Sequence, residues 1–310
     1  MNKLSIILPA YNERENIAPA ARRIPEVLEA AEIPFELIFV NDGSGDGTWQ
    51  AICDAARADA RVRGVCFSRN FGKEAALFAG LQEAEGDCCL TMDCDLQHPP
   101  EYIPEMFRLW REGNEVVEAV KADRGKENPI YRFCTRCFYG LISRASGFDM
   151  EKSSDFRLLD RKVVDALLAM PERSTFYRAL SSWVGFQTAQ VPFRVEERTC
   201  GSSKWSLAAL MRYALNSITS FSSAPMQIIA FLGGLTLLVS VVMGIQTLAR
   251  KLMGHALEGF TTVIIVQLFI GGVVMISLGI IGHYIAKIYE EIKHRPRYII
   301  SERCGKTEKK

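Results

Sequence analysis

Two long apolar segments in the last third of the chain limit what it can fold into. Residues 226–248 contain no charged side chain, and in residues 261–286 only His283 can carry a charge near neutral pH. As a helix, 226–248 would be roughly 34 Å long, whereas the hydrocarbon core of a bilayer is about 30 Å thick. A buried helix of a soluble protein is seldom this long and this free of charge. The pattern therefore predicts a transmembrane hairpin over residues 226–286.

The basic residues around this hairpin predict its orientation. The loop between the two segments carries Arg250 and Lys251, whereas the flank after the second segment holds a larger basic set: Lys287, Lys293, Arg295, Arg297, Arg303 and Lys306. By the positive-inside rule both termini lie on the cytoplasmic side. We expect a multi-pass protein of the cytoplasmic membrane, with a cytoplasmic catalytic domain over 1–200 and a basic cytoplasmic tail over 287–310.

Composition excludes several other classes. The formal net charge of +1 argues against a general nucleic-acid binder. The nine cysteines are expected as reduced thiols, and the single CxxC of Cys134 and Cys137 lacks the second pair of a zinc site. The N-terminal run "KLSIILPAYNE" is short and turns acidic at once, so we expect it to belong to the fold and not to a signal peptide.

The first hundred residues alternate between strand and helix patterns. The apolar runs "LSIILPAY", "FELIFVN", "VRGVCFS" and "CCLTMD" predict strands, and the segments between them have helical spacing. This alternation predicts an α/β fold with a mainly parallel sheet covered on both faces. Ligands of such sheets bind beyond the carboxyl ends of the strands, where the polar clusters "PAYNERE", "NDGSGDGT", "RNFGKE" and "DCDLQHPP" fall.

The fourth cluster contains candidate metal ligands. If the strand continues through this segment, Asp93, Asp95 and Gln97 point to one side, because strand side chains alternate. Oxygen ligands of this kind suit Mg²⁺ or Mn²⁺ bound together with substrate phosphates. His98 is out of step and is expected to pack or form hydrogen bonds. The sequence has neither a GxxxxGK[ST] loop nor a GxGxxG after the first strand, so the metal and basic side chains must hold any phosphate.

Six ordered motifs carry a family resemblance. "PAYNERENI", "VNDGSGDGT", "RNFGKEAAL", "MDCDLQHPP", "SSDFRLLDR" and "RTCGSSKWS" resemble the motifs of glycosyltransferase family 2 enzymes with the GT-A (Rossmann-like) fold. The most similar branch is that of polyprenyl-phosphate glycosyltransferases, which includes bactoprenol glucosyltransferases and dolichyl-phosphate mannose synthases. The resemblance runs from about residue 3 to the second apolar segment.

The resemblance implies a role for most residues of these motifs. The nucleotide-sugar group that it implies is Pro9, Tyr11, Glu13, Val40, Asp42, Asp93, Cys94, Asp95 and Gln97. Within it Asp93, Asp95 and Gln97 would hold Mg²⁺ or Mn²⁺ against the diphosphate, and Asp95 counts as catalytic. At position 94 the family usually has a small residue such as Ala, so Cys94 is expected to alter packing more than chemistry.

Basic residues are expected to meet the phosphate groups. By resemblance Arg124 lies in a mobile acceptor loop, and Arg198 and Lys204 form a basic pair near the membrane interface. Arg132 and Arg136 stand one turn apart beside the apolar face of "PIYRFCTRCFYGLISR". The segment 201–225 repeats an amphipathic pattern directly before the hairpin. We expect both helices to lie in the interface, where arginines can meet a lipid phosphate.

The implied reaction is an inverting transfer of a hexose to polyprenyl (undecaprenyl) phosphate. A phosphate monoester has a second pKa of about 6, so the attacking oxygen is largely ionised at neutral pH. Asp155 is the implied catalytic base or orienting carboxylate, and the alternative is that it anchors a turn by pairing with Arg157. The resemblance also implies a homo-oligomer, a tetramer in related enzymes, with membrane lipids and a flippase as further partners.

Three choices stay open at this point. Glucose from UDP-glucose is the first candidate donor, and GlcNAc or mannose donors are alternatives. A processive polysaccharide synthase would need a QxxRW motif and more membrane spans, and the sequence shows neither. A catalytically silent scaffold or sugar-nucleotide sensor would have no need of Asp93, Asp95, Gln97 and Asp155.

Overall fold

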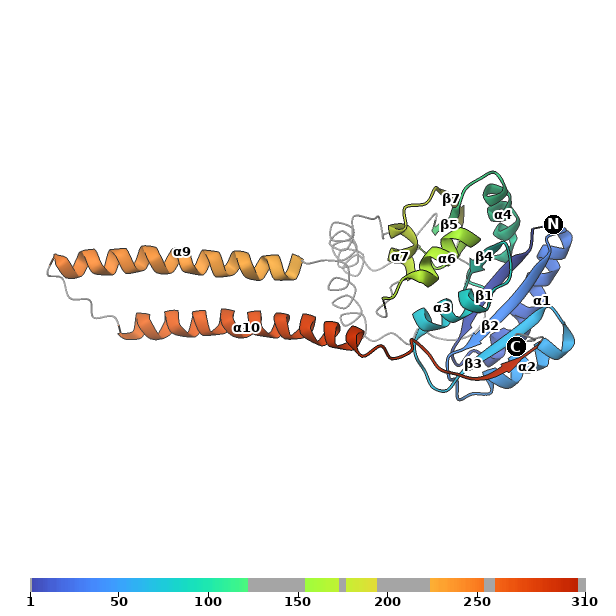
Figure 1. The fold of residues 1–310 in the computed structure, drawn as a ribbon, viewed down its shortest axis with the longest axis horizontal. Coiled ribbons are helices and arrows are strands. Elements are labelled where there is room, and N and C mark those ends of the chain that lie inside the picture. The colour runs from blue at the N-terminus through green and yellow to red at the C-terminus, as the bar shows by residue number, and fades with distance from the viewer. Residues whose placement is uncertain (1, 122–153, 173–176, 194–223, 254–259, 306–310) are drawn as a thin grey trace. The chain divides into compact units, whose positions relative to one another are not determined.

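The chain forms two compact units in the computed structural model (Figure 1). The structure describes residues 2–121, 154–172, 177–193, 224–253 and 260–305. Unit 1 comprises residues 1–210 and 296–310, and unit 2 comprises residues 211–295. The segment 201–225 and the helix predicted around Arg132 and Arg136 lie outside the described residues, apart from the start of α9.

Unit 1 contains the following helices and strands: β1 (Leu4–Ala10), α1 (Arg14–Ala30), β2 (Phe35–Asn41), α2 (Thr48–Ala58), β3 (Val62–Phe67), α3 (Lys73–Glu83), β4 (Cys88–Thr91), η1 (Pro100–Tyr102), α4 (Ile103–Arg111), β5 (Val116–Lys121), β6 (Arg157–Asp160), α6 (Arg161–Ala169), α7 (Tyr177–Trp183), β7 (Thr188–Phe193) and β8 (Ile300–Cys304). The strands form one sheet in the order β7-β5-β6-β4-β1-β2-β3-β8. The predicted α/β fold is confirmed.

The sheet is mixed, although its centre is parallel as predicted. Strand β1 pairs in parallel with β2 and β4, and β2 pairs in parallel with β3. Strand β6 runs antiparallel to both β4 and β5, and β8 runs antiparallel to β3. The chain passes from β3 across to β4 on the far side of β1, so the strand order reverses at β1. In sheets of this kind the ligand crevice lies beyond the carboxyl ends at such a reversal.

Alternating side chains of the central strands divide the core into two layers. Leu4, Ile6 and Leu8 of β1 belong to a buried cluster that includes side chains of α1, α2 and α4. Ile7 faces the opposite way and meets α3, where a Cβ added to Gly80 would lie 2.2 Å from Ile7 Cγ2. Helix α3 therefore approaches β1 so closely that only glycine fits at position 80.

The C-terminal strand returns to the sheet of unit 1. Strand β8 pairs with β3 and forms one edge of the sheet, and the ring of Tyr298 stacks on Phe67 at a centroid distance of 5.0 Å. Trp49 Nε1 donates to Glu302 Oε2 at 2.8 Å, and the guanidinium of Arg297 lies over the Phe78 ring of α3. We call residues 296–305 the C-terminal strap. The predicted tail 287–310 is thus divided between the end of α10 and this strap.

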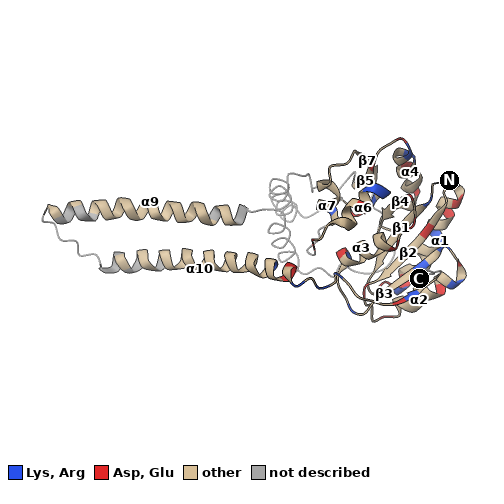
Figure 2. Cartoon of the chain, in the orientation of Figure 1, with Lys and Arg blue, Asp and Glu red and all other residues tan. Residues whose placement is uncertain are grey.

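Among the described residues of unit 2 are two helices that contact each other, α9 (Ala224–Leu252) and α10 (Phe260–Ile292). Each includes an apolar window long enough to cross a membrane, Ile229–Gln246 and Phe269–Ile292, and neither window is buried in the structure. In Figure 2 the coloured part of α9 is tan throughout, whereas α10 has red and blue segments near its end. Helix α10 continues past the predicted boundary at Ala286 and ends at Ile292, two residues before His294, whose φ of 46° is not helical. Exposed apolar side chains of this extent mark a surface that interacts with a membrane or with another protein.

The close approach of α3 to β1 predicts a cost for any side chain at position 80. We expect Gly80→Ala to lower the free energy of unfolding by about 1–3 kcal/mol, because the added methyl group would overpack the contact with Ile7. Urea titration of the full chain in detergent, followed by tryptophan fluorescence, measures this change. Gly45→Ala is the matched control, since nothing lies within 4 Å of a Cβ added there. Equal stability of the two variants would contradict the assigned contact.

Candidate active site

Three loops at the carboxyl ends of β1, β2 and β3 are tied together by hydrogen bonds. The Asn12 N–H donates to Ser44 Oγ at 2.9 Å, and the Gly45 N–H donates to Asn12 Oδ1 at 3.0 Å. Asn12 has φ 55°, a left-handed conformation that Asn tolerates better than most residues. The Glu13 N–H donates to Thr48 Oγ1 at 3.0 Å. These bonds hold the first two predicted clusters side by side.

Asp42 links the second loop to the third. Its Oδ1 accepts from the Phe71 N–H at 2.6 Å and its Oδ2 from the Gly72 N–H at 2.9 Å. The side chain is buried, and this burial raises the pKa of the Asp42 carboxyl despite the two hydrogen bonds, which favour the ionised form. Gly43 has φ 65°, and a Cβ there would lie 2.3 Å from the Arg69 carbonyl carbon. The loop that leads into α3 is thereby fixed.

The predicted metal ligands lie in a turn and not on an extended strand. Strand β4 ends at Thr91, and Leu96 has φ 58°, which breaks any strand alternation. The Gln97 N–H donates to Asp95 Oδ1 at 3.2 Å, the side-chain-to-backbone bond of an Asx turn. The period-two argument for a shared side of Asp93, Asp95 and Gln97 was therefore wrong, because it extended the strand through this turn. The turn itself keeps the three residues in one short segment at the end of β4.

His98 packs as the sequence predicts. Its ring stacks on Phe156 at a centroid distance of 5.2 Å and meets the edge of Phe193, and its Nδ1 accepts from the Asp93 N–H at 3.4 Å. Burial lowers the pKa of His98, which favours the neutral ring that can accept this bond. Cys94 is also buried. Both residues thus support the turn from within the core.

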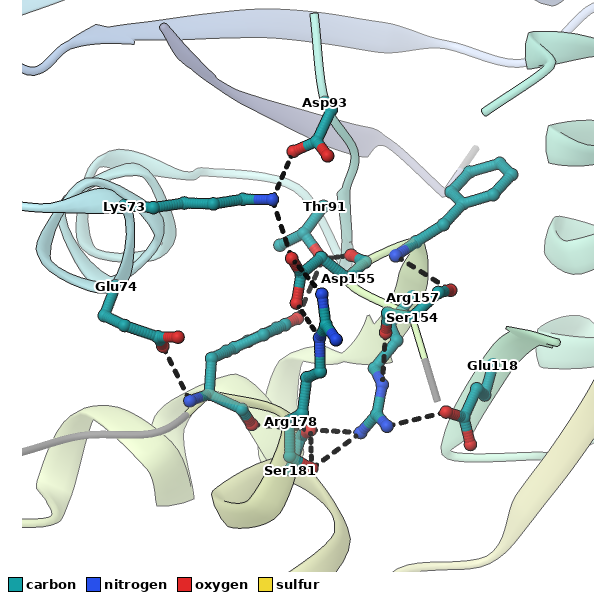
Figure 3. Close-up of polar contacts among 12 residues, drawn as sticks. Lys73, Glu74, Thr91, Asp93, Glu118, Ser154, Asp155, Arg157, Arg178 and Ser181 are labelled. Carbon is teal, nitrogen blue, oxygen red and sulfur yellow. Dashed lines mark hydrogen bonds and ion pairs between the residues drawn. The ribbon is translucent and has the colours of Figure 1, made fainter. Parts of the chain in front are cut away.

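Asp155 occupies the centre of the charged cluster in Figure 3. Arg178 holds both of its oxygens, with Nε to Oδ1 at 2.6 Å and Nη2 to Oδ2 at 2.8 Å, and Lys73 Nζ lies 2.6 Å from Oδ2. Burial alone would raise the pKa of Asp155, but the charges of Lys73 and Arg178 hold it well below its usual range. A carboxylate this firmly ionised is a weak base. The arrangement suits an orienting carboxylate.

Lys73 also contacts the turn that follows β4. Its Nζ lies 2.5 Å from Asp93 Oδ1, so one ammonium joins the carboxylates that follow β4 and precede β6. Loss of hydration would raise the pKa of the Asp93 carboxyl, but the charge of Lys73 outweighs this effect, so the pKa is lowered. Beside Lys73, Glu74 Oε2 accepts from the Tyr177 N–H at 2.7 Å. Burial raises the pKa of Glu74 to about 7. Helix α3 is thereby joined to the start of α7.

Arg157 has a separate, structural role. It is almost fully buried, its Nη2 lies 2.7 Å from Glu118 Oε1, and its other nitrogens donate to the Ser154 and Arg178 carbonyl oxygens. The pairing of Asp155 with Arg157 that the sequence offered is wrong, since Asp155 pairs with Arg178. Arg157 instead braces the backbone on both sides of this ion pair, as Figure 3 shows.

The donor set at the end of β4 fits a hard divalent ion. Asp93 and Asp95 offer carboxylate oxygens, Gln97 offers an amide oxygen, and the Asp93 side chain is about one-third exposed. The ammonium of Lys73 beside Asp93 demonstrates that this position attracts positive charge. Within the described part of the chain no group of three or more His, Cys, Asp or Glu side chains could hold a metal ion. Substrate oxygens would therefore have to complete the coordination, as is usual for Mg²⁺.

The remaining predicted donor-site residues line the neighbouring strand ends. Pro9 and Val40 are register partners in the β1 and β2 pair. Val40 is fully buried, whereas Tyr11 is 49% exposed and Glu13 is partly buried. The predicted phosphate-binding residues Arg124, Arg132, Arg136, Arg198 and Lys204 lie outside the described residues. Their predicted roles stay predictions.

Comparison with known proteins places this site in a family. The family model described as "Glycosyl transferase family 2" matches residues 5–168, which include β1 to β6 and Asp155. The chain belongs to glycosyl transferase family 2. The resemblance inferred from the six motifs is confirmed, and with it the assignment to the transferases.

Relatives of this family 2 chain match almost its whole length. An uncharacterized glycosyltransferase of Synechocystis is 39% identical over 305 residues, which cover 98% of this chain and 96% of the relative. A bactoprenol glucosyl transferase of Shigella phage SfV is 38% identical over 300 residues, which cover 96% of this chain and 98% of the relative. Both alignments are too long to omit the apolar helices of unit 2.

A solved structure supports the fold of the family 2 domain. Glucosyl-3-phosphoglycerate synthase of Mycobacterium tuberculosis, in complex with Mn²⁺, uridine diphosphate and phosphoglyceric acid, has a TM-score of 0.52 and 19% sequence identity. The match covers 71% of this chain and 78% of that protein. At this identity the likeness concerns the fold alone.

Sequence reasoning missed Lys73, Glu74 and Arg178. Lys73 and Glu74 lie within the quoted motif "RNFGKEAAL", and their position at the start of a helix that follows a strand end was an available signal. Arg178 sits on α7 in a segment with no recognisable motif. Only the folded chain brings it to Asp155.

The buried pair of Arg157 and Glu118 predicts a large effect on stability. We expect Glu118→Ala to lower the free energy of unfolding by about 3–5 kcal/mol, because the buried Arg157 guanidinium loses the carboxylate that lies 2.7 Å from its Nη2. Urea titration of the full chain in detergent measures the change. Glu112→Ala is the control, since Glu112 forms an ion pair of 2.5 Å with Arg108 and both side chains are exposed. Removing an exposed pair should change the free energy of unfolding by less than about 1 kcal/mol. A similarly small effect at Glu118 would contradict the bracing role of Arg157.

Proposed function

We propose that the chain transfers a hexose, with glucose from UDP-glucose as the first candidate, to polyprenyl phosphate at the cytoplasmic face of the membrane. The observation that carries this proposal is the similarity to the bactoprenol glucosyl transferase of Shigella phage SfV, which extends over 96% of the chain. This chain combines a family 2 domain with two apolar helices. Such a combination would bring the catalytic domain to an acceptor that is a membrane lipid. Product stereochemistry is inverted in this proposal, so an α-linked donor gives a β-linked lipid phosphate sugar.

On the donor side, the chain provides a rigid edge of loops and a set of oxygen ligands. Pro9, Tyr11, Glu13, Val40 and Asp42 would bind the base and ribose. Asp93, Asp95 and Gln97 would hold Mg²⁺ or Mn²⁺. Bound there, the divalent ion supplies positive charge to the oxygens of the diphosphate. The hydrogen bonds between the loops support this assignment, because a preorganised edge loses little entropy when the donor binds.

On the acceptor side, Asp155 would orient the reacting groups. Its two oxygens contact Arg178 and Lys73, and its pKa lies well below the usual range. Asp155 would therefore be a weak general base. A phosphate monoester already carries most of its second charge at neutral pH. The acceptor therefore needs neutralising charge more than it needs a base. Arg124, Arg132, Arg136, Arg198 and Lys204 would provide that charge to the lipid phosphate.

The C-terminal strap supports the proposed topology. Residues before α9 and after α10 belong to the same folded unit, and one folded unit lies on one side of a bilayer. Helices α9 and α10 would then cross the membrane twice and return the chain to the side of unit 1. Together with this return, the basic flank after α10 supports a topology in which unit 1 and both termini would lie in the cytoplasm. A homo-oligomer and a flippase partner belong to the same proposal.

A lipid-labelling assay tests the proposed reaction. Membranes that contain the protein are incubated with polyprenyl phosphate, Mg²⁺ or Mn²⁺, and labelled UDP-glucose, UDP-GlcNAc or GDP-mannose in parallel. We expect label in the lipid with UDP-glucose, lost on metal chelation. Asp95→Ala should lower the rate by at least about a hundredfold, because one ligand of the ion is removed.

Three outcomes change the proposal. Labelling with another donor replaces glucose by that sugar. Wild-type rates in Asp95→Ala contradict the metal site. Absence of labelling with every donor favours the catalytically silent scaffold or sensor.

A further inference from the structure

Lys73 has no role in the function proposed above, although it connects the two halves of the site. It is the first residue of α3, and its Nζ lies 2.5 Å from Asp93 Oδ1 and 2.6 Å from Asp155 Oδ2 (Figure 3). Its side chain is 41% exposed. The ammonium is therefore held by two carboxylates and is still open to solvent and to an entering ligand.

The two carboxylates hold Lys73 unequally. Asp155 is buried and is anchored through both oxygens by Arg178, so its position is held by a second cation besides Lys73. Asp93 is about one-third exposed and lies in the turn after β4. Of the two ion pairs of Lys73, the one with Asp93 is therefore the one that can break. The ion pair with Asp155 would then keep the ammonium close to the site.

Asp93 is also a proposed ligand of the divalent ion, so two cations are drawn to one carboxylate. An ammonium and a metal ion beside the same oxygen repel each other. Even for unit charges in water at about 4 Å, this repulsion is worth roughly a fivefold change in a binding constant. The ion therefore binds at Asp93 against the charge of Lys73, unless another anion takes over that ammonium.

We propose that Lys73 is a positioning residue that occupies the cation position beside Asp93 until the donor arrives, and that the divalent ion displaces its ammonium when it enters with the donor diphosphate. This inference rests on the proposed function for the identity of the donor. The diphosphate brings negative charge into the site at the moment when Lys73 is released, and the ammonium can turn toward it while it stays bound to Asp155. Ion and donor then bind cooperatively, since each favours the state that accepts the other.

Binding of Mn²⁺ alone tests this competition without any sugar transfer. Free Mn²⁺ is measured by electron paramagnetic resonance during titration of the full chain in detergent. We expect Lys73→Met and Lys73→Gln to bind Mn²⁺ at least roughly fivefold more tightly than wild type, because the competing charge is gone. Lys73→Arg keeps a cation and should bind Mn²⁺ about as weakly as wild type. Lys162→Met is the matched control, because Lys162 also lies 2.5 Å from a carboxylate, that of Glu115, outside the site.

The transfer assay then supplies a second readout. Lys73→Met should lower the rate of sugar transfer although it binds Mn²⁺ more tightly, a split that a merely structural lysine would not produce. Equal or weaker Mn²⁺ binding by both neutral variants overturns the inference. Because the Mn²⁺ titration contains neither acceptor nor sugar, a protein that binds Mn²⁺ as expected and labels no lipid defeats only the proposed function. One that labels lipid but binds Mn²⁺ independently of Lys73 defeats only this inference.

Discussion

The neutralised carboxylate of Asp155 is the interaction on which the candidate site depends. A buried carboxylate without a counter-charge would be protonated or would destabilise the fold by several kcal/mol. Arg178 and Lys73 prevent this, and they come from α7 and α3, two helices far apart in the sequence. Both cations have a second contact. The Arg178 carbonyl oxygen accepts a hydrogen bond from Arg157, and the Lys73 ammonium forms an ion pair with Asp93. Charge balance at one residue thus sets the position of both helices relative to the end of β4.

The loops around this centre are held by their own hydrogen bonds, so the donor edge does not rely on a ligand for its shape. Asn12 and Ser44 join the first two loops, and Asp42 joins the second to the start of α3. Since α3 begins at Lys73, the donor edge and the acceptor carboxylate are linked through a few covalent and hydrogen bonds. A site of this kind stays assembled between catalytic cycles, which suits a soluble donor that must meet an acceptor confined to the membrane plane.

The sequence was informative where structure is local and misleading where pairing is distant. Strands β1 to β4 and the two apolar helices follow from patterns within single segments. Strand β8 pairs with β3 across more than two hundred residues, so no local pattern could reveal this pairing. Asp93 and Asp95 were recognised, but their geometry was derived from a strand that ends two residues earlier, at Thr91. Lys73 and Arg178 gain their meaning only from Asp155, because a single basic residue on a helix is usually a solvated surface charge.

The C-terminal strap has a consequence for how the protein is made. Ribosomes synthesise β3 early and β8 last, after both apolar helices. Until then β3 is an open edge, whose unpaired backbone groups can pair with another chain. The cover for this edge is therefore completed only after both helices of unit 2 have been translated. A chain that ends before β8 would keep β3 as an exposed sheet edge, which is a site for pairing with another chain.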